Sequence, residues 1–187
     1  MPSLANAVRF CLFACLLCWP FFSAANSFVA QIRQANVIYT GSHFHIQTQI
    51  DYQLSPTAKE ALHKGIPLSW QVLIEIRKVG SLWDSTLSEQ TLPYRLRFHA
   101  LLNQYEVLKP DKESEMFLTL NAALGFMSSL HDSNPVPADV LQTGQRYKLA
   151  IKCQFDREAL PVPLRPFAYL DSQWSLSSGW YLWPIQK

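Results

Sequence analysis

The chain has 187 residues and a mass of 21.4 kDa, which leaves room for one domain with a targeting segment and excludes two full hydrophobic cores. Charged residues make up 16% of the chain and hydrophobic residues 49%, a composition that excludes a disordered protein. The formal net charge of +2 is far below the basic excess of a nucleic-acid-binding protein, so nucleic acid is not expected as a partner.

Residues 1–25 are predicted to form a signal peptide. Arg9 precedes a 13-residue apolar stretch, residues 10–22, and the small side chains of Ser23 and Ala25 then suit the narrow pockets of a signal peptidase. We expect cleavage between Ala25 and Asn26, export to the periplasm, and a single β-rich domain over residues 26–187.

Two alternatives to cleavage are less favoured. An uncleaved anchor in the inner membrane needs about 20 apolar residues to cross the bilayer as a helix, more than this segment offers. A lipid-attachment box ending at Cys15 is disfavoured by the bulky Phe13 and by the apolar run that continues beyond the cysteine. After cleavage we expect no stable membrane span, and the oligomeric state is left open.

Strands with one buried face dominate the rest of the chain. Apolar and polar side chains alternate over residues 43–54, 68–76, 92–98 and 147–155, and Asn103-Gln104 marks a hairpin between two apolar runs. Amphipathic strands need a second layer to bury their apolar faces. The pattern therefore predicts a mostly β fold, a two-layer antiparallel β-sandwich of about seven or eight strands with two short helices.

The two predicted helices interrupt the strands. The first begins at Ser55-Pro56, a capping residue followed by proline, and ends at Gly65. The second begins near Thr119 and continues to the Asn134-Pro135 break, with an apolar stripe from Leu120 to Leu130 that is expected to lie on a sheet.

Only one cysteine remains after the predicted cleavage. Cys153 falls among the apolar positions of residues 147–155, so we expect a buried small side chain and not a nucleophile. No internal disulfide is then possible.

The last third of the chain is rich in proline and tryptophan. Three prolines in residues 160–166 favour an extended, polyproline-like crossing of a sheet edge. In residues 180–183, Trp180 and Leu182 share one face and Tyr181 and Trp183 the other, so both faces are apolar. This pattern favours a central or doubly covered strand; the alternative is an exposed aromatic patch that binds a protein or a sugar.

Several segments together carry a resemblance to a known family. They are Gly65-Ile-Pro-Leu, Thr91-Leu-Pro-Tyr-Arg-Leu, Thr143-Gly-Gln-Arg-Tyr, Leu160-Pro-Val-Pro-Leu and Ser172-Gln-Trp-Ser-Leu-Ser-Ser-Gly-Trp. With these segments in this order and spacing, the chain resembles domain-of-unknown-function family 4390 of proteobacteria over nearly the whole mature region. The resemblance implies exported proteins without an established activity, often encoded beside a membrane sensor kinase and its response regulator, and it transfers no catalytic residues.

No catalytic motif stands out in the sequence. It has neither a Gly-x-Ser-x-Gly elbow nor a glycine-rich phosphate loop, so we expect no enzymatic activity and no cofactor. His43 and His45 lie about 7 Å apart along one strand face and supply two metal ligands, which is the basis of a weaker hydrolase or metalloprotein hypothesis.

The sequence favours a non-catalytic periplasmic binding or accessory protein. An envelope protein such as a sensor kinase ectodomain is the expected partner, and Trp174, Trp180, Tyr181 and Trp183 are the candidate binding residues. The main alternative is a carbohydrate- or peptidoglycan-binding module that uses the same tryptophans.

Overall fold

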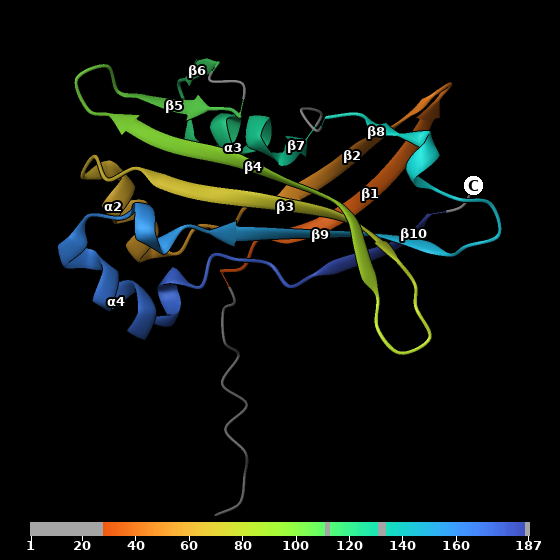
Figure 1. The fold of residues 1–187 in the computed structure, drawn as a ribbon. Helices are drawn as coiled ribbons and strands as arrows, with labels where there is room; N and C mark the ends of the chain where they lie inside the picture. The colour runs from red at the N-terminus through yellow and green to blue at the C-terminus, as the bar shows by residue number, and fades with distance from the viewer. Residues whose placement is uncertain (1–27, 111–112, 131–133, 186–187) are drawn as a thin grey trace, which may run out of the picture.

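Two antiparallel β-sheets pack face to face in the computed structural model, which describes residues 28–110, 113–130 and 134–185 (Figure 1). This confirms the predicted sandwich. The predicted signal peptide and the Ala25–Asn26 junction lie outside these residues. Within the described part of the chain, no helix combines the length and apolar character needed to cross a membrane.

The larger sheet has six strands in the order β10-β9-β3-β4-β5-β6, and every neighbouring pair is antiparallel. Its strands are β3 (Leu68–Lys78), β4 (Ser85–His99), β5 (Gln104–Leu108), β6 (Ser114–Phe117), β9 (Tyr147–Phe155) and β10 (Tyr181–Ile185). The expected hairpin joins β4 and β5, where Asn103 takes the left-handed conformation with φ of 51°.

The smaller sheet is built on β2, which pairs with β1 along one edge and with two short strands along the other. Its strands are β1 (Gln31–Thr40), β2 (His43–Asp51), β7 (Ser129–Leu130) and β8 (Val136–Pro137). In Figure 1, β1 and β2 cross obliquely behind the larger sheet, with α3 (Leu120–Ser128) beside them.

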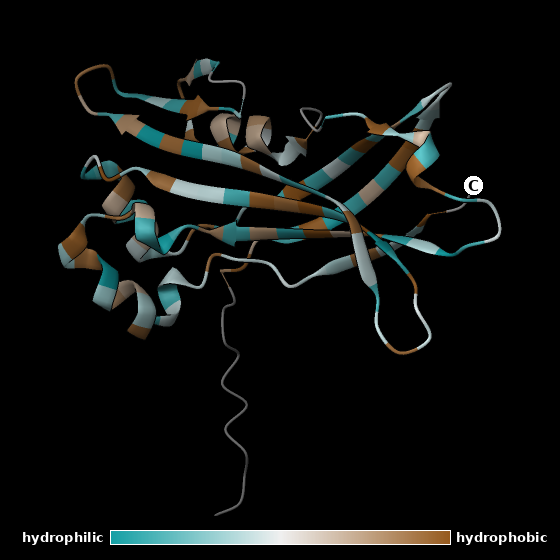
Figure 2. Cartoon of the chain, in the orientation of Figure 1, coloured by the Kyte–Doolittle hydropathy of each residue, from teal (hydrophilic) through white to brown (hydrophobic). Residues whose placement is uncertain are grey.

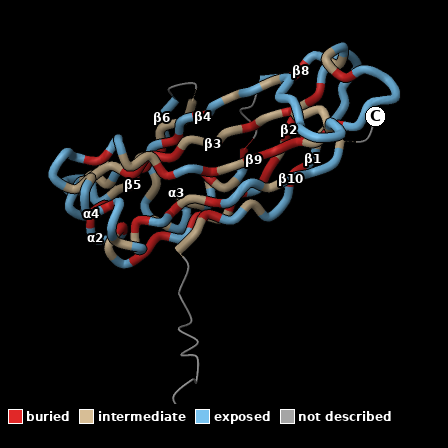
Figure 3. The backbone as a smooth tube through the Cα atoms, turned by 60° about the horizontal axis from the view of Figure 1, so that its bottom comes forward, coloured by how far each residue is buried: buried red, intermediate tan, exposed pale blue. Residues whose placement is uncertain are grey.

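The core lies between the two sheets. Apolar and polar residues alternate along the strands in Figure 2, and buried positions alternate with exposed ones in Figure 3. Trp70 is 1% exposed and meets Tyr52 and Phe155 edge-on, with ring centroids 5.4 and 5.3 Å away. The alternate residues of β3 (Ser69, Gln71, Leu73, Glu75 and Arg77) point to the opposite side, which we call the outer face of the larger sheet.

Both predicted helices are present, with one correction. Ser55 caps α2 (Pro56–His63) by accepting a hydrogen bond from Ala58 N, and Gly65 has the positive φ expected just after the helix. Thr119 caps α3 in the same way, but this helix ends at Ser128. Ser129 and Leu130 pair with β2 instead, so Leu130 is buried from a strand and not from the predicted helix.

The proline-rich segment differs from the prediction of an extended crossing. It forms a 3-10 helix, η3 (Val162–Leu164), that leads into α4 (Arg165–Leu170). Pro163 and Pro166 occupy early positions of these two helices, where the fixed φ of proline suits a helix and its missing N–H costs nothing. The described residues therefore contain one more α-helix than expected.

Candidate partner-binding surface

The last strand, β10, is placed by serine side chains that precede it. Ser177 Oγ accepts a hydrogen bond from Phe155 N at 2.9 Å, and Ser178 Oγ accepts one from Cys153 N at 2.8 Å. The chain then pairs with β9 from Tyr181 to Ile185 and forms the edge of the larger sheet. The expectation of a central or doubly covered strand is therefore wrong, because β10 has a strand neighbour on one side only and because Leu182 and Trp183, on opposite faces, are both exposed.

The two faces of β10 carry the residues predicted from the sequence. Leu182 lies opposite Ala150, on the outer face, and Trp183 lies opposite Leu149, on the side of the core. Trp180, Leu182 and Trp183 are 41%, 48% and 41% exposed. The Tyr181 and Trp183 rings stack nearly parallel, with centroids 6.4 Å apart and an interplanar angle of 8°.

A hollow of about 450 Å³ opens beside Trp183. Trp183, Pro184 and Ile185 of β10 form one wall, and Val79 and Tyr147 contribute to the other. This lining is mainly apolar, and the volume suits a large side chain of a partner. We call Trp180, Leu182, Trp183 and this hollow the β10 surface.

Positive charge surrounds the β10 surface. The Arg77 guanidinium carbon lies 4.5 Å from the centroid of the Trp180 ring, and the Lys152 ammonium lies 5.8 Å from it. Lys148 forms an ion pair with Asp84 and donates a hydrogen bond to its carboxylate. This hydrogen bond lowers the pKa of the Asp84 carboxyl.

The balance of charge at this end of the sheet is cationic. Arg77 also pairs with Glu75, at 2.6 Å between Nε and Oε2, while Arg146 adds another cation to the lining of the hollow. Arg77, Arg146, Lys148 and Lys152 therefore outnumber the carboxylates of Glu75 and Asp84. The surface combines apolar contact area with an excess of positive charge.

The turn between β3 and β4 adds two residues that sequence reasoning missed. Leu82 and Trp83 are each 86% exposed at the tip of this hairpin, which projects from the body of the molecule (Figure 1). A Cβ at Gly80 would collide with the carbonyl oxygen of Trp83, so the turn requires glycine there. Leucine and tryptophan side by side in a short connection between two amphipathic strands were the available signal.

The remaining predicted site residues lie elsewhere. Trp174 is 3% exposed and stacks on Phe155 in the core, with ring centroids 5.9 Å apart, so it is out of reach of a ligand at the surface. His43 and His45 lie on the polar face of β2, in the other sheet, and His43 Nδ1 is 2.8 Å from Ser42 Oγ. Among the described residues, no group of three or more His, Cys, Asp or Glu side chains is arranged to hold a metal ion.

Comparisons with known proteins give one match. A family model described as "Domain of unknown function (DUF4390)" matches residues 29–184, nearly the whole described chain. No curated protein and no solved structure matches the chain.

Proposed function

We propose that this chain, which belongs to the DUF4390 family, is a non-catalytic accessory protein of the bacterial periplasm. The sequence resemblance to this family implies export and no established activity. It binds an envelope protein through the β10 surface. The ectodomain of a membrane sensor kinase is the partner class, on the ground that such kinases are often encoded beside members of the family.

Exposed tryptophans on a sheet edge are the observation that carries this proposal. Tryptophan is enriched among the residues that dominate binding energy at protein interfaces, especially beside a pocket that a partner side chain fills. Here Trp180 and Trp183 are each 41% exposed, and Trp183 lines an apolar hollow. An edge strand with such side chains promotes aggregation unless a partner or another segment covers it.

The geometry favours an acidic partner segment that docks with its side chains. β10 is only five residues long, and Pro184 lacks a backbone donor, so the edge is poorly suited to the addition of a long strand. The excess of cations around Trp180 attracts carboxylates. We therefore expect the partner to insert one apolar side chain into the hollow and to place acidic residues near Lys152 and Arg77.

Site-specific photo-crosslinking in living cells tests the proposal. A photoreactive residue at position 183 is expected to capture a defined envelope protein, with a sensor kinase ectodomain as the expected product. Position 59 is the matched control, because Lys59 is exposed on α2 at the opposite end of the molecule (Figure 1). The same adduct from both positions, or none from position 183 in folded and exported protein, would contradict the proposal.

The captured partner then permits a quantitative test. Trp183→Ala is expected to weaken binding to the purified ectodomain at least about tenfold, because a central aromatic anchor is lost. Lys59→Ala should leave the affinity unchanged, and both variants should keep the wild-type circular dichroism. Retention on peptidoglycan that Trp183→Ala abolishes, with no protein partner found, would favour the carbohydrate alternative instead.

A further inference from the structure

Two hollows meet on the outer face of the larger sheet, away from the apolar hollow at β10. Their volumes are about 490 and 270 Å³, and both are lined by Gln71 and Asp156, whose side chains are joined by a hydrogen bond of 3.1 Å. We call the combined feature the polar groove. Lys152, Arg157 and Tyr169 line the larger part, and Ser69, Arg95 and Lys109 line the smaller part.

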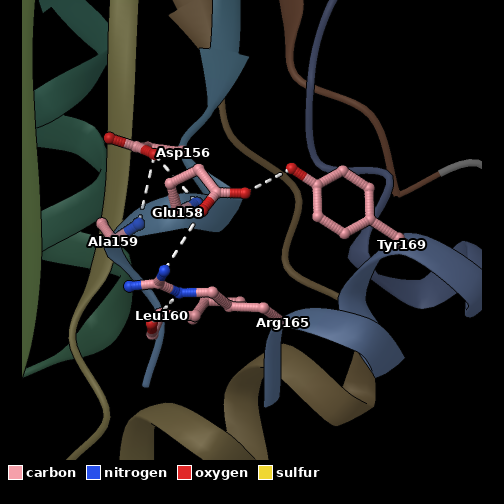
Figure 4. Close-up of polar contacts among 6 residues, drawn as sticks. All are labelled: Asp156, Glu158, Ala159, Leu160, Arg165 and Tyr169. Atoms are coloured by element: carbon pink, nitrogen blue, oxygen red, sulfur yellow. Dashed lines mark hydrogen bonds and ion pairs between the residues drawn. The ribbon is translucent and has the colours of Figure 1, made fainter. Parts of the chain in front are cut away.

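The carboxylates in the wall of the polar groove are already engaged by the protein. Glu158 accepts hydrogen bonds from Tyr169 Oη at 2.6 Å and from Arg165 Nη1 at 3.2 Å (Figure 4). Asp156 Oδ1 accepts from the backbone N–H groups of Glu158 and Ala159, at 3.1 and 3.2 Å. These bonds hold the short helix η2 (Arg157–Ala159) and α4 in place, so the wall is built before any ligand arrives.

Three cations of the polar groove form no ion pair with the described residues: Arg95, Arg157 and Lys152. Arg95 is exposed and forms no ion pair with any described residue. The Arg157 guanidinium carbon lies 5.2 Å from the centroid of the Tyr169 ring, and Lys152 lies against Trp180. Because these three cations outnumber the carboxylates of Asp156 and Glu158, and Glu158 also pairs with Arg165, the groove favours an anion.

Ser69 supplies an independent indication of a ligand. Ser69 is 8% exposed, and its Oγ has no hydrogen-bond partner among the described residues. The alternation of β3 directs this hydroxyl to the outer face, in register with Arg95. A buried hydroxyl without a partner costs free energy, which a ligand oxygen in the groove would recover.

We propose that the polar groove binds an acidic saccharide. The larger part has the volume of a small-molecule site, and the side-chain amides and hydroxyls of both parts are suited to the many hydroxyls of a sugar. Arg95 pairs with the acidic group of the ligand, and Ser69 Oγ hydrogen-bonds a ring substituent. This site shares Lys152 with the cations around Trp180, but it has no lining residue in common with the hollow beside Trp183.

Binding of defined probes to the purified mature chain tests this inference. A short oligogalacturonate, which carries a carboxylate on every sugar, is expected to bind and to shift amide signals of β3 and β4 in NMR spectra. Its methyl-esterified form has the same backbone without the charges and is expected to bind at least about tenfold more weakly, because charge-assisted hydrogen bonds are lost.

Two variants separate recognition from general electrostatics. Arg95→Gln is expected to weaken binding of oligogalacturonate about tenfold or more. Arg97→Gln is the matched control, because Arg97 is also exposed on the outer face of β4 but lies outside the groove and near Glu106, at 3.9 Å. Ser69→Ala is expected to weaken binding about fivefold while the melting temperature of the free protein stays the same or rises, since the hydroxyl has no partner to lose.

Several outcomes would overturn the inference. These are no binding of oligogalacturonate, equal binding of the charged and esterified probes, or equal losses in Arg95→Gln and Arg97→Gln. Equally tight binding of a polyglutamate peptide or of inorganic phosphate alone would show an anion site without selectivity for sugars. A Ser69→Ala variant that loses stability and keeps its affinity would assign the hydroxyl a structural role.

Discussion

Tyr52 and Cys153 show how the core controls the chemistry of single side chains. Burial raises the pKa of the Tyr52 phenol well above its usual value, and burial raises the pKa of the Cys153 thiol to about 12. Cys153 was expected to be a buried small side chain, and this is confirmed because it is 0% exposed. Its thiolate is essentially absent at neutral pH, so the folded protein offers no nucleophile there.

The raised pKa of Cys153 predicts a loss of stability in alkaline solution. Above its ordinary pKa of 9.0, the thiol of the unfolded chain releases its proton while the folded protein keeps it until about pH 12. The unfolded state then binds fewer protons, so the free energy of unfolding falls as pH rises through this window, by at most about 1.4 kcal/mol per pH unit for one group.

Urea unfolding between about pH 8 and about pH 11 measures this effect. Cys153→Ala is the control, and it is expected to show a shallower slope over the same range, even if its stability is lower throughout because of the cavity. Identical slopes for the wild type and the variant would contradict the assigned pKa shift.

The prediction of elements from sequence succeeded where local side chains decide the structure. Period-two alternation identifies β9 from Tyr147 to Phe155, and Ser55 with Gly65 marks the two ends of α2. Alternation also assigns Trp180 and Trp183 to opposite faces of one strand. It does not say which strands lie beside that strand, and this is why β10 was expected at the centre of a sheet.

The proline-rich segment was mispredicted for another reason. Proline at φ near −65° is compatible with an extended chain and with the first turn of a helix, so composition alone does not choose between them. The helix is stabilised by side-chain contacts that composition does not reveal, such as those of Glu158 with Arg165 and Tyr169. The polar groove was missed as well, because its residues come from separate strands whose register is set by tertiary packing.

Two glycines of separate elements are predicted to respond oppositely to the same substitution. Gly125 lies inside α3, and a Cβ added there would have nothing within 4 Å, so Gly125→Ala should stabilise the protein by about 0.5 to 1 kcal/mol. Gly80→Ala should destabilise it by about 1 kcal/mol or more, since the new Cβ meets the Trp83 carbonyl oxygen. Chemical denaturation of both variants checks the two signs, and a neutral Gly80→Ala would contradict the described turn.

At the scale of the whole molecule, the larger sheet has one buried side and one open side. Its central strands β3 and β9 are paired on both edges and contribute large buried side chains to the core, whereas β6 lies at an edge and has no buried residue. The molecule thus has a rigid centre and a less protected rim. Both proposed binding regions use the outer face or the edge of this rigid sheet.

Hydrogen exchange is expected to follow this arrangement. Amides of β3 and β9 should exchange only through global unfolding, while those of β6 and of the two-residue strand β8 should exchange through local opening. Residue-resolved exchange measured under native conditions provides the test. Protection of β6 equal to that of β3 would show that the sheet opens as a single cooperative unit.

The position of β10 also has a consequence for biosynthesis. Residues 181–185 follow β9 in the chain, so the edge of β9 stays bare until they pair with it. A chain stopped before Tyr181 would keep an unpaired edge built from Leu149 and Ile151, the kind of template on which nascent proteins aggregate. The tryptophan-bearing segment that we propose for recognition thereby also protects the edge of β9 from aggregation.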